Sequence, residues 1–256
     1  MLTLLGKYNL SDKATCQAEG KKTSASSFQQ TEQTSSRLLF CQYDPVTESP
    51  LHSSATTSHP NRQILAIARL DNTAELQHTF QLPYTPFPDE QKLIIQAYQR
   101  WGEDCVQHLH GAFIFAIWDS RKQHLFCARD RMGTYPFFYY QSPSKFVFSN
   151  QMNFLVRHCQ EELTSNAEWI VDHLCNIWFD KNATFYNEIQ RLPPAYTLTI
   201  SAKKFSIRRY WDFDLYKETH LASDKEYIDV ARKHFQTAVK RCLRPPYTIG
   251  LVLCKS

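Results

Sequence analysis

Residues 101–140, WGEDCVQHLHGAFIFAIWDSRKQHLFCARDRMGTYPFFYY, contain the pattern that decides the fold class. The apolar run at 111–119 alternates as a strand does, the polar SRKQ provides a turn, and 124–130 return as a second strand. The segment RMGTYP at 131–136 interrupts the pattern before a third apolar run, PFFYY, at 136–140. The stretch therefore predicts a buried antiparallel meander of three strands.

Length and charge bound the class of protein. A chain of 256 residues can hold one large domain, or one domain and part of another. The formal net charge is only +4 and the basic residues are spread along the chain, so we expect no nucleic-acid partner. The leucine-rich start has no basic region before it and no long apolar stretch after it. We therefore expect neither a signal peptide nor a membrane span, and a cytoplasmic location by default.

The cysteine and histidine spacings give little support to a metal site. None of the eight cysteines forms a C-x-x-C pair, which favours reduced core thiols over zinc ligands or disulfides. His108 and His110 lie beside Glu103, Asp104 and Cys105, but no second ligand pair with zinc spacing occurs. We interpret this segment as a polar loop and predict no metal site.

Other strands and helices flank the meander. Apolar runs predict strands at 64–70, 145–150, 196–200 and 206–213. A helix is expected to begin at Asp89 and to stop at Gly102, because apolar residues recur there at helical spacing. Residues 11–62 are mostly polar; they predict a weakly paired strand near 37–43 and a mobile tract at 47–60.

Two further helices are indicated by their capping residues. Asn166 is expected to cap a helix with an apolar stripe formed by Trp169, Ile170, Leu174, Ile177 and Trp178. Ser223 and Glu226 have the spacing of a capping box ahead of a long amphipathic helix, and a buried strand is expected at 247–253. Because the pattern changes near residue 213, we predict domains at 1–213 and 214–256.

The charged and aromatic residues of the meander are expected to be structural. Asp119, Arg129, Asp130 and Arg131 are predicted to form one salt-bridge network at the end of the sheet. No basic residues interleave with PFFYY, so its aromatic side chains are predicted to lie in the core and not to stack on bases.

Several segments together resemble the amidotransferase-like half of the asparagine synthetases. Leu-x-Gly-x-Phe-x-Phe-Ala-Ile-Trp-Asp at 109–119 and Ala-Arg-Asp-Arg-x-Gly-x-x-Pro at 128–136 carry most of the likeness. The segments ARLDNTAEL, AYQRWGEDC, TFYNEIQRLPPAYTLTI and RYWDFD continue it, in the same order, over about 64–253. The chain reads RLDN at 69–72 where other members read GEIYN. In this it resembles the diverse branch of the family that includes lasso-peptide cyclases and other amide-forming enzymes.

The resemblance implies an α+β fold and a two-part enzyme. The first part would be a class II glutaminase-like domain, a four-layer α/β/β/α sandwich of two antiparallel sheets between helices, of the Ntn-hydrolase type. In the family, a cysteine exposed by removal of the initiator Met hydrolyses glutamine to release ammonia. The second part would bind ATP and Mg through a Ser-Gly-Gly-x-Asp-Ser loop and activate a carboxylate as its adenylate.

The chain departs from the family where glutamine would react. Leu2 stands where the family has its nucleophilic cysteine, whose free α-amine acts as the base. Ile67, Ala68 and Arg69 stand where the family has Asn-Gly-Glu, so a substrate amine would meet a cation. Asp89 matches the aspartate that holds the substrate's amine in the family, and it also fits a helix cap. We therefore expect no glutamine hydrolysis and assign no catalytic residue.

A second departure lies at the last residues. Leu253 matches the leucine before the family's ATP loop, and by this carry-over it is the one ATP-binding position. Cys254, Lys255 and Ser256 follow it where Ser-Gly-Gly should begin, so we expect no cofactor for this chain alone. A frameshift, a premature stop or a gene fragment would each give such a truncated member of the family.

These expectations leave alternative functions open. The family activity is ATP-dependent amide formation with glutamine or amine nitrogen, here without glutaminase activity. The alternatives are a non-catalytic binding or dimerisation module, or one subunit of a split amide ligase. The expected partners are accordingly a second copy of the chain in a homodimer, or a separate synthetase subunit, with no nucleic acid and no membrane.

Overall fold

The computed structural model describes residues 3–9, 38–43, 61–159, 162–177, 180 and 182–243. The chain divides into two compact units, Met1–Asp212 and Phe213–Ser256. This division falls one residue before the predicted boundary. The assignment of the second unit to a synthetase domain stays a prediction.

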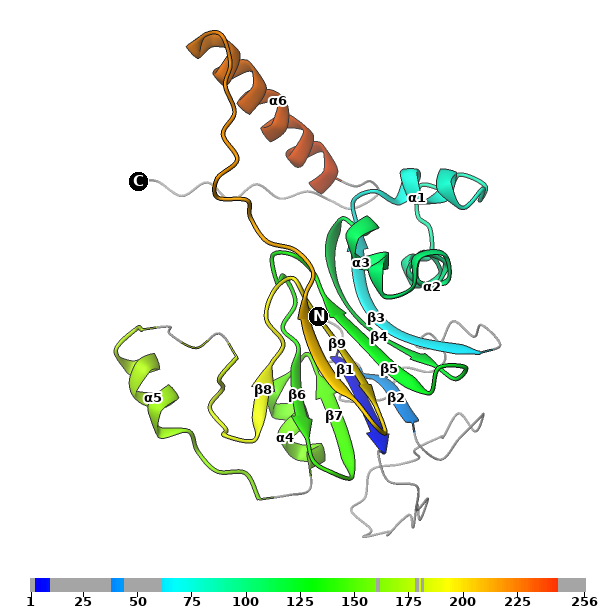
Figure 1. The fold of residues 1–256 in the computed structure, drawn as a ribbon, viewed down its shortest axis with the longest axis vertical. Helices are drawn as coiled ribbons and strands as arrows, with labels where there is room; N and C mark the ends of the chain where they lie inside the picture. Colours follow the sequence, from blue (N-terminus) through cyan, green and yellow to red (C-terminus); the bar gives the residue numbers. More distant parts are fainter. Residues whose placement is uncertain are drawn as a thin grey trace. The chain divides into compact units, whose positions relative to one another are not determined.

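The first unit contains two antiparallel sheets (Figure 1). The first sheet has the strand order β2-β1-β7-β6-β8, with β1 at Thr3–Asn9, β2 at Leu38–Tyr43, β6 at Phe138–Gln141, β7 at Lys145–Ser149 and β8 at Ile189–Arg191. The second sheet has the order β10-β9-β5-β4-β3, with β3 at Arg62–Leu70, β4 at Gly111–Asp119, β5 at His124–Arg129, β9 at Tyr196–Ser201 and β10 at Phe205–Arg209.

Helices cover the outer faces of both sheets. The second sheet packs against α1 (Thr73–Thr79), α2 (Glu90–Trp101) and α3 (Cys105–His108), with the 3-10 turn η1 (Gly102–Asp104) between the last two. The first sheet packs against α4 (Met152–Cys159). Helix α5 (Ala167–Leu174) belongs to a lobe next to β8 (Figure 1). The predicted α+β fold, with two antiparallel sheets between helices, is therefore confirmed.

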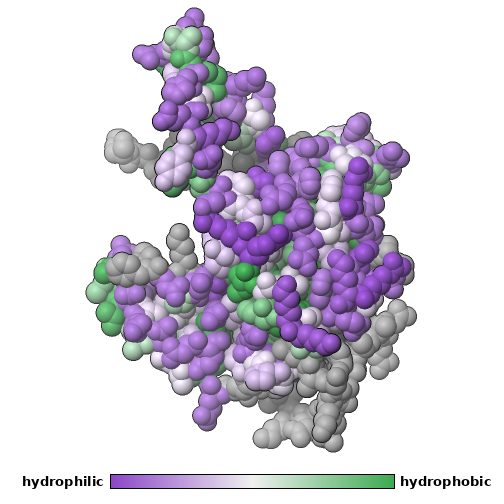
Figure 2. Space-filling view, viewed as in Figure 1, coloured by the Kyte–Doolittle hydropathy of each residue, from purple (hydrophilic) through white to green (hydrophobic). Residues whose placement is uncertain are grey.

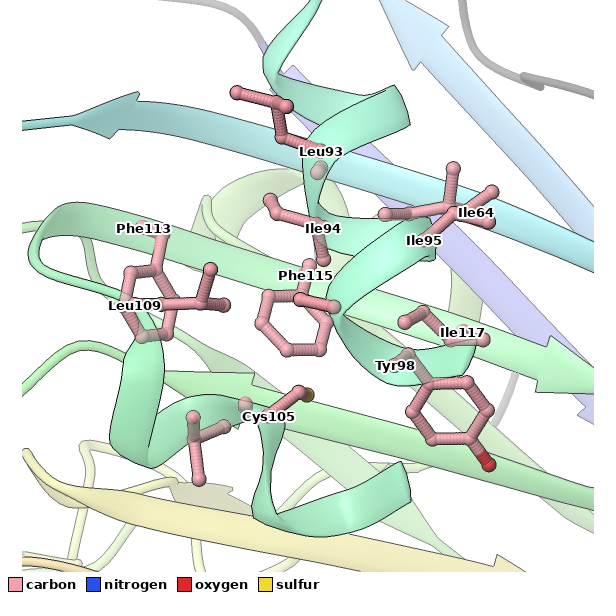
Figure 3. Packing of buried hydrophobic residues seen from close by; sticks show 14 of the residues in the cluster. Ile64, Leu93, Ile94, Ile95, Tyr98, Cys105, Leu109, Phe113, Phe115 and Ile117 are labelled. Carbon is pink, nitrogen blue, oxygen red and sulfur yellow. The ribbon is translucent and has the colours of Figure 1, made fainter. Parts of the chain in front are cut away.

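Strand β4 is apolar from Phe113 to Trp118 because both of its faces are buried there. Phe113, Phe115 and Ile117 point toward the helices, where Figure 3 shows Phe115 packed among side chains of α2. The intervening Ile114 and Trp118 point into the core between the two sheets. Burial of each large side chain contributes about 1.5–3 kcal/mol. The two faces of β4 therefore contribute to two different layers of the core.

The predicted three-stranded meander is wrong in its third strand. β4 and β5 pair as expected, but the second neighbour of β5 is β9, and β6 pairs with β7 and β8 in the other sheet. The residues between β5 and β6 carry the chain from one sheet to the other. Sequence alternation predicts strands but does not say which sheet each one joins.

The predicted helix after Asn166 is confirmed, but its length and packing are not. The Asn166 side chain accepts a hydrogen bond from the backbone N–H of Trp169, at 3.0 Å, as a cap does. The helix ends at Leu174, and none of its residues is buried. Leu174, expected in an apolar core stripe, is 79% exposed. Trp178 lies outside the described residues.

The second unit contains α6 (Asp224–Cys242) among its described residues. Ser223 Oγ accepts a hydrogen bond from Glu226 N, so the predicted cap is confirmed. The return bond differs from that of a capping box, because Glu226 Oε2 accepts from Ala222 N, one residue before the cap. The predicted strand at 247–253 and the tract at 47–60 lie outside the described residues. Within the described part of the chain, no helix combines the length and apolarity needed to cross a bilayer.

Candidate functional site

The end of β3, where the resemblance places the glutamine site, lies against the start of β4. Arg69 pairs with Ala112, and Leu70 pairs with Gly111. Gly111 has a φ of +125°, and a Cβ atom there would lie 2.2 Å from the Arg69 carbonyl oxygen. Only glycine allows this close approach without displacing the strand.

Asn72 fixes the chain just after β3. Its buried side-chain amide donates to the carbonyl oxygen of His108 at 3.0 Å and accepts from the backbone N–H of His110 at 3.2 Å. The backbone N–H of Asp71 also donates to the His110 carbonyl oxygen, at 2.7 Å. These bonds give the asparagine of RLDN a structural role.

Two acidic residues at the start of α2 have different roles. The Asp89 carboxylate accepts hydrogen bonds from the backbone N–H groups of Gln91 and Lys92, at 3.1 and 3.3 Å, so the predicted helix cap is confirmed. The Glu90 carboxylate instead reaches β3 and accepts from the backbone N–H of Leu70 at 2.9 Å. Glu90, which sequence reasoning missed, is therefore the acidic residue that contacts the end of β3. The predicted substrate contact of Asp89 stays a prediction.

The three residues that replace Asn-Gly-Glu point in different directions. Ile67 is partly buried in the core between the sheets, and Ala68 packs on the helix side. The guanidinium of Arg69 remains 43% exposed, and its Nη2 lies 3.9 Å from Asp71 Oδ1. The exposed group at this site is therefore a cation, loosely paired with a carboxylate.

Tyr135 approaches the same site from the loop between β5 and β6. Burial raises the pKa of its phenol; Arg69 lowers the pKa, whereas Glu90 and Asp130 raise it further. Arg69 of β3 and Glu90 of α2 therefore both act electrostatically on the phenol. The phenol therefore stays protonated and able to donate a hydrogen bond at neutral pH.

Arg129 holds this loop in shape. Its guanidinium donates to the carbonyl oxygens of Tyr135, Leu192 and Gly133, at 2.6, 2.7 and 2.7 Å. Burial lowers the pKa of Arg129 to about 10, so the group is still charged at neutral pH. The Asp130 carboxylate accepts hydrogen bonds from backbone N–H groups, those of Phe113, Met132 and Thr134.

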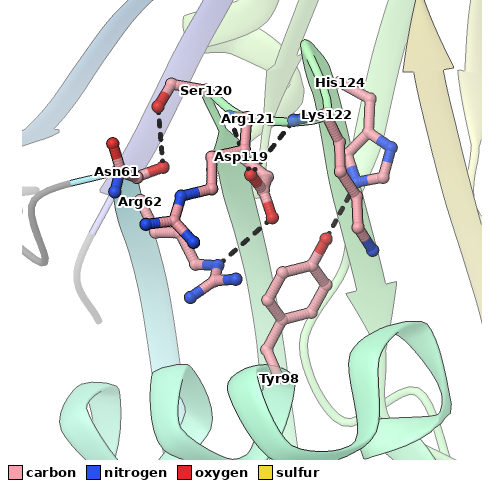
Figure 4. Close-up of polar contacts among 8 residues, drawn as sticks. All are labelled: Asn61, Arg62, Tyr98, Asp119, Ser120, Arg121, Lys122 and His124. Atoms are coloured by element: carbon pink, nitrogen blue, oxygen red, sulfur yellow. Dashed lines mark hydrogen bonds and ion pairs between the residues drawn. The ribbon is translucent and has the colours of Figure 1, made fainter.

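The predicted single salt-bridge network is wrong, because Asp119 lies at one end of the β4–β5 pair and Arg129 at the other, opposite Ile114. Asp119 is at the far end, where it accepts from Arg62 Nε at 3.2 Å and from the backbone N–H groups of Arg121 and Lys122 (Figure 4). The interpretation of these charged residues as structural is supported, since Asp119, Arg129 and Asp130 form hydrogen bonds mainly with backbone groups.

The described cysteines are poor nucleophiles for this site. Burial raises the pKa of the Cys105 and Cys127 thiols well above the usual range and that of Cys159 to about 11. A protonated thiol does not attack a carbonyl carbon efficiently. Cys175 is exposed, but it follows α5, on the opposite side of the sandwich from β3 and α2 (Figure 1).

The remaining predicted positions do not add to the site. His108 stacks on Trp101 with ring centroids 4.0 Å apart, and the described residues contain no group of three or more histidine, cysteine or acidic side chains able to hold a metal ion. Leu2 and Leu253 lie outside the described residues, so their predicted roles stay predictions.

Comparison with known proteins assigns the family. The family model described as a glutamine amidotransferase domain matches residues 57–211. Asparagine synthetase (glutamine-hydrolysing) 3 of Bacillus subtilis is 32% identical over 154 residues, covering 59% of this chain and 25% of the relative. Putative asparagine synthetase (glutamine-hydrolysing) 2 of Methanocaldococcus jannaschii is 27% identical over 184 residues, covering 71% of this chain and 36% of the relative. The chain thus spans about a third or less of the length of these relatives.

The solved structures that match this chain include glutamine amidotransferases. The glutamine phosphoribosylpyrophosphate amidotransferase of Bacillus subtilis matches with a TM-score of 0.40 at 12% identity, over 61% of this chain and 30% of that chain. A class II glutamine aminotransferase domain protein of Silicibacter pomeroyi matches with a TM-score of 0.36 at 12% identity, over 62% and 71%. From the match of its family model, the chain belongs to the glutamine amidotransferase domain family, in the branch related to the asparagine synthetases.

Proposed function

We propose that this amidotransferase domain does not hydrolyse glutamine, and that it is the non-catalytic part of an enzyme that forms amides at the expense of ATP. The observation that carries the proposal is the set of side chains at the end of β3. Arg69 presents a cation, and Glu90 is already bonded to the Leu70 backbone.

The charge arrangement disfavours glutamine as a ligand. An α-ammonium group near Arg69 would be repelled by its like charge. The Glu90 carboxylate is held by its hydrogen bond to the Leu70 N–H, so it is not free to turn toward such a group without weakening that bond. Binding would therefore be weak even before any bond is broken.

The described residues near this site also provide no nucleophile with an adjacent base. The three buried thiols are held in the protonated form, and the phenol of Tyr135 has a raised pKa. Amide hydrolysis by this family's chemistry needs an activated thiol. The domain would then retain its fold to support a synthetase, as the names of the relatives suggest.

Release of ammonia tests the first half of the proposal. The purified chain is incubated with glutamine labelled with ¹⁵N at the side-chain amide, and NMR follows the appearance of labelled ammonium. We expect no more ammonium than in a buffer blank. Sustained release that scales with protein concentration would overturn the proposal.

Amide formation tests the second half. The synthetase portion of the Bacillus subtilis relative is supplied as a separate polypeptide with ATP and an acceptor carboxylate, and the nitrogen source is varied. We expect amide product with ammonium and none with glutamine. Product formed equally well from glutamine would show that the domain is an active glutaminase.

A further inference from the structure

Helix α5 presents its apolar side chains to solvent. Val171 is 57% exposed, Leu174 is 79% exposed, and Ile177 just beyond the helix is 39% exposed. Val171 and Leu174 are three positions apart and so form one apolar stripe on α5. Figure 2 shows the corresponding hydrophobic patch over the α5 lobe, at the left of the view. An exposed apolar patch with a polar rim marks a contact site.

The lobe that carries the stripe is fixed by its own contacts. The backbone N–H of Asn166 donates to the Phe185 carbonyl oxygen at 2.8 Å, and Thr164 Oγ1 donates to Glu188 Oε1 at 2.7 Å. The indole of Trp169 meets the Phe185 ring edge-on, with centroids 6.1 Å apart. The stripe is therefore held in place by hydrogen bonds and ring contacts before any partner arrives.

A cavity of about 100 Å³ lies beside the stripe. It is lined by Asn166, Glu168, Trp169, Asp172, His173, Ile177, Asp180 and Ala183. Three of these residues are carboxylates, and no lysine or arginine is among them. The rings of Trp169 and His173 stack with centroids 4.8 Å apart and an angle of 8° between their planes, so the imidazole covers one face of the indole.

We propose that the stripe and the cavity together bind a peptide segment in which a lysine or arginine lies beside apolar side chains. The cation enters the cavity, where the carboxylates of Glu168 and Asp172 attract it. The apolar side chains of the segment cover Val171 and Leu174. The site is separate from the end of β3, so it does not depend on the proposed loss of glutaminase activity.

Charge complementarity selects this occupant over a second copy of α5. Two copies of the helix face to face would bring Glu168 and Asp172 of one copy near the same carboxylates of the other, and like charges across an interface are unfavourable. A basic, apolar segment removes that repulsion and also covers the exposed stripe. Binding by such a segment weakens as salt is added, because part of the attraction is screened.

Peptide binding tests the proposal directly. The probe is a fluorescein-labelled synthetic peptide in which pairs of leucines alternate with pairs of lysines. It is titrated with the purified 256-residue chain, and binding is followed by fluorescence anisotropy. The matched peptide has glutamate at every lysine position. We expect the lysine peptide to bind at least tenfold more tightly than the glutamate peptide, and to lose affinity between 50 and 500 mM salt, by about tenfold.

Variants locate the binding to α5. Glu168→Gln with Asp172→Asn, and separately Leu174→Ser, should each weaken the lysine peptide about tenfold, since a tenfold change corresponds to one lost charge or apolar contact of ordinary size. The matched control replaces two exposed acidic residues elsewhere, Glu75→Gln with Asp224→Asn, and should leave affinity unchanged. Equal weakening by the control, or no effect of Leu174→Ser, would overturn the proposal. The proposal would also be overturned if sedimentation showed that the chain is a dimer and that Leu174→Ser converts it to a monomer.

Discussion

Glu90 binds Leu70 through a hydrogen bond, with 2.9 Å between Oε1 and the backbone nitrogen, that joins the start of α2 to the end of β3. Leu70 is fully buried, and β3 is the last strand in its sheet among the described strands. The N–H groups on the outer edge of such a strand have no strand partner, so an acceptor must come from elsewhere. Glu90 supplies it.

The acceptor role of Glu90 predicts the effect of its replacement. Glu90→Ala should lower the free energy of unfolding by about 1–3 kcal/mol, because the Leu70 N–H loses its acceptor inside the protein. Glu90→Gln keeps an oxygen there and should cost less than half as much. Urea unfolding measures both, with Glu75→Ala on exposed α1 surface as the control. Equal losses for the two Glu90 variants would show that the charge matters and the acceptor does not.

Gly111 and Gly102 form a matched pair for a second prediction. Both have a positive φ, +125° and +62°, but a Cβ at Gly111 would meet the Arg69 carbonyl at 2.2 Å, whereas one at Gly102 meets nothing within 4 Å. Gly102→Ala should cost about 1 kcal/mol from backbone strain alone. Gly111→Ala should cost at least about 3 kcal/mol or prevent folding, because strand β3 must move. Similar thermal unfolding midpoints for the two variants would contradict this.

The elements that sequence predicted correctly are those specified by local pattern. The alternation in β4, the helical spacing and Asp89 cap of α2, and the Ser223 cap each depend on residues close together in the chain. The sheet assignment of β6 depends instead on its pairing with β8, where Phe138 lies opposite Arg191. No short-range pattern contains that information. Sequence analysis also did not predict β1 and α4.

The same distinction explains the site. The apolar run predicted a strand at 64–70, and positions 67–69 lie near the end of β3, where Glu90 of α2 binds the Leu70 N–H. Glu90 was missed because its partner is a backbone N–H group, which carries no sequence signal. A strand edge that lacks a neighbour, followed by an acidic residue in the first turn of the next long helix, is the pattern that would have indicated it.

Arg129 provides a third prediction. Arg129→Lys should lower the free energy of unfolding by about 3 kcal/mol, because an ammonium group cannot reach the carbonyls of Tyr135, Leu192 and Gly133 together. Arg131→Lys is the control, since Arg131 donates a single exposed hydrogen bond, to Gln107, and should cost less than about 1 kcal/mol. Chemical denaturation of both variants under the same conditions measures the two losses of stability. If Arg129→Lys lowered the free energy of unfolding no more than Arg131→Lys does, the role assigned to the Arg129 guanidinium would be refuted.

The cap at Asp89 gives a fourth prediction, which also separates the two roles considered for this residue. Asp89→Asn keeps an oxygen that accepts from Gln91 and Lys92 and should leave stability within about 0.5 kcal/mol, whereas Asp89→Ala should cost about 1 kcal/mol. Neither variant should change glutamine binding, measured by calorimetry, if the site does not bind glutamine. Measurable binding by the unchanged chain that Asp89→Asn abolishes would support the substrate role instead.

His124 makes folding stability sensitive to pH. Its Nε2 lies 2.8 Å from the Tyr98 hydroxyl (Figure 4), and burial lowers the pKa of the imidazole. Lys122 lowers the pKa further, while Glu103 and Asp119 partly oppose this effect. The unfolded chain, with an ordinary histidine pKa of about 6.5, therefore takes up the proton at a higher pH than the folded chain does.

It follows that the contribution of His124 to stability is complete above about pH 7.5 and is lost as the pH falls through 6.5 toward the lower folded value. His124→Gln should flatten the dependence of the urea midpoint on pH between about 7.5 and 5.5, whereas His78→Gln, on the exposed surface of α1, should leave the slope unchanged. Asp119 acts in a separate window. Burial opposes its ionisation, but hydrogen bonds from Lys122 N–H and Arg62 outweigh burial and lower its pKa, so its contribution disappears only below about pH 4. A slope between pH 7.5 and 5.5 that survives in His124→Gln would assign the sensitivity to another group.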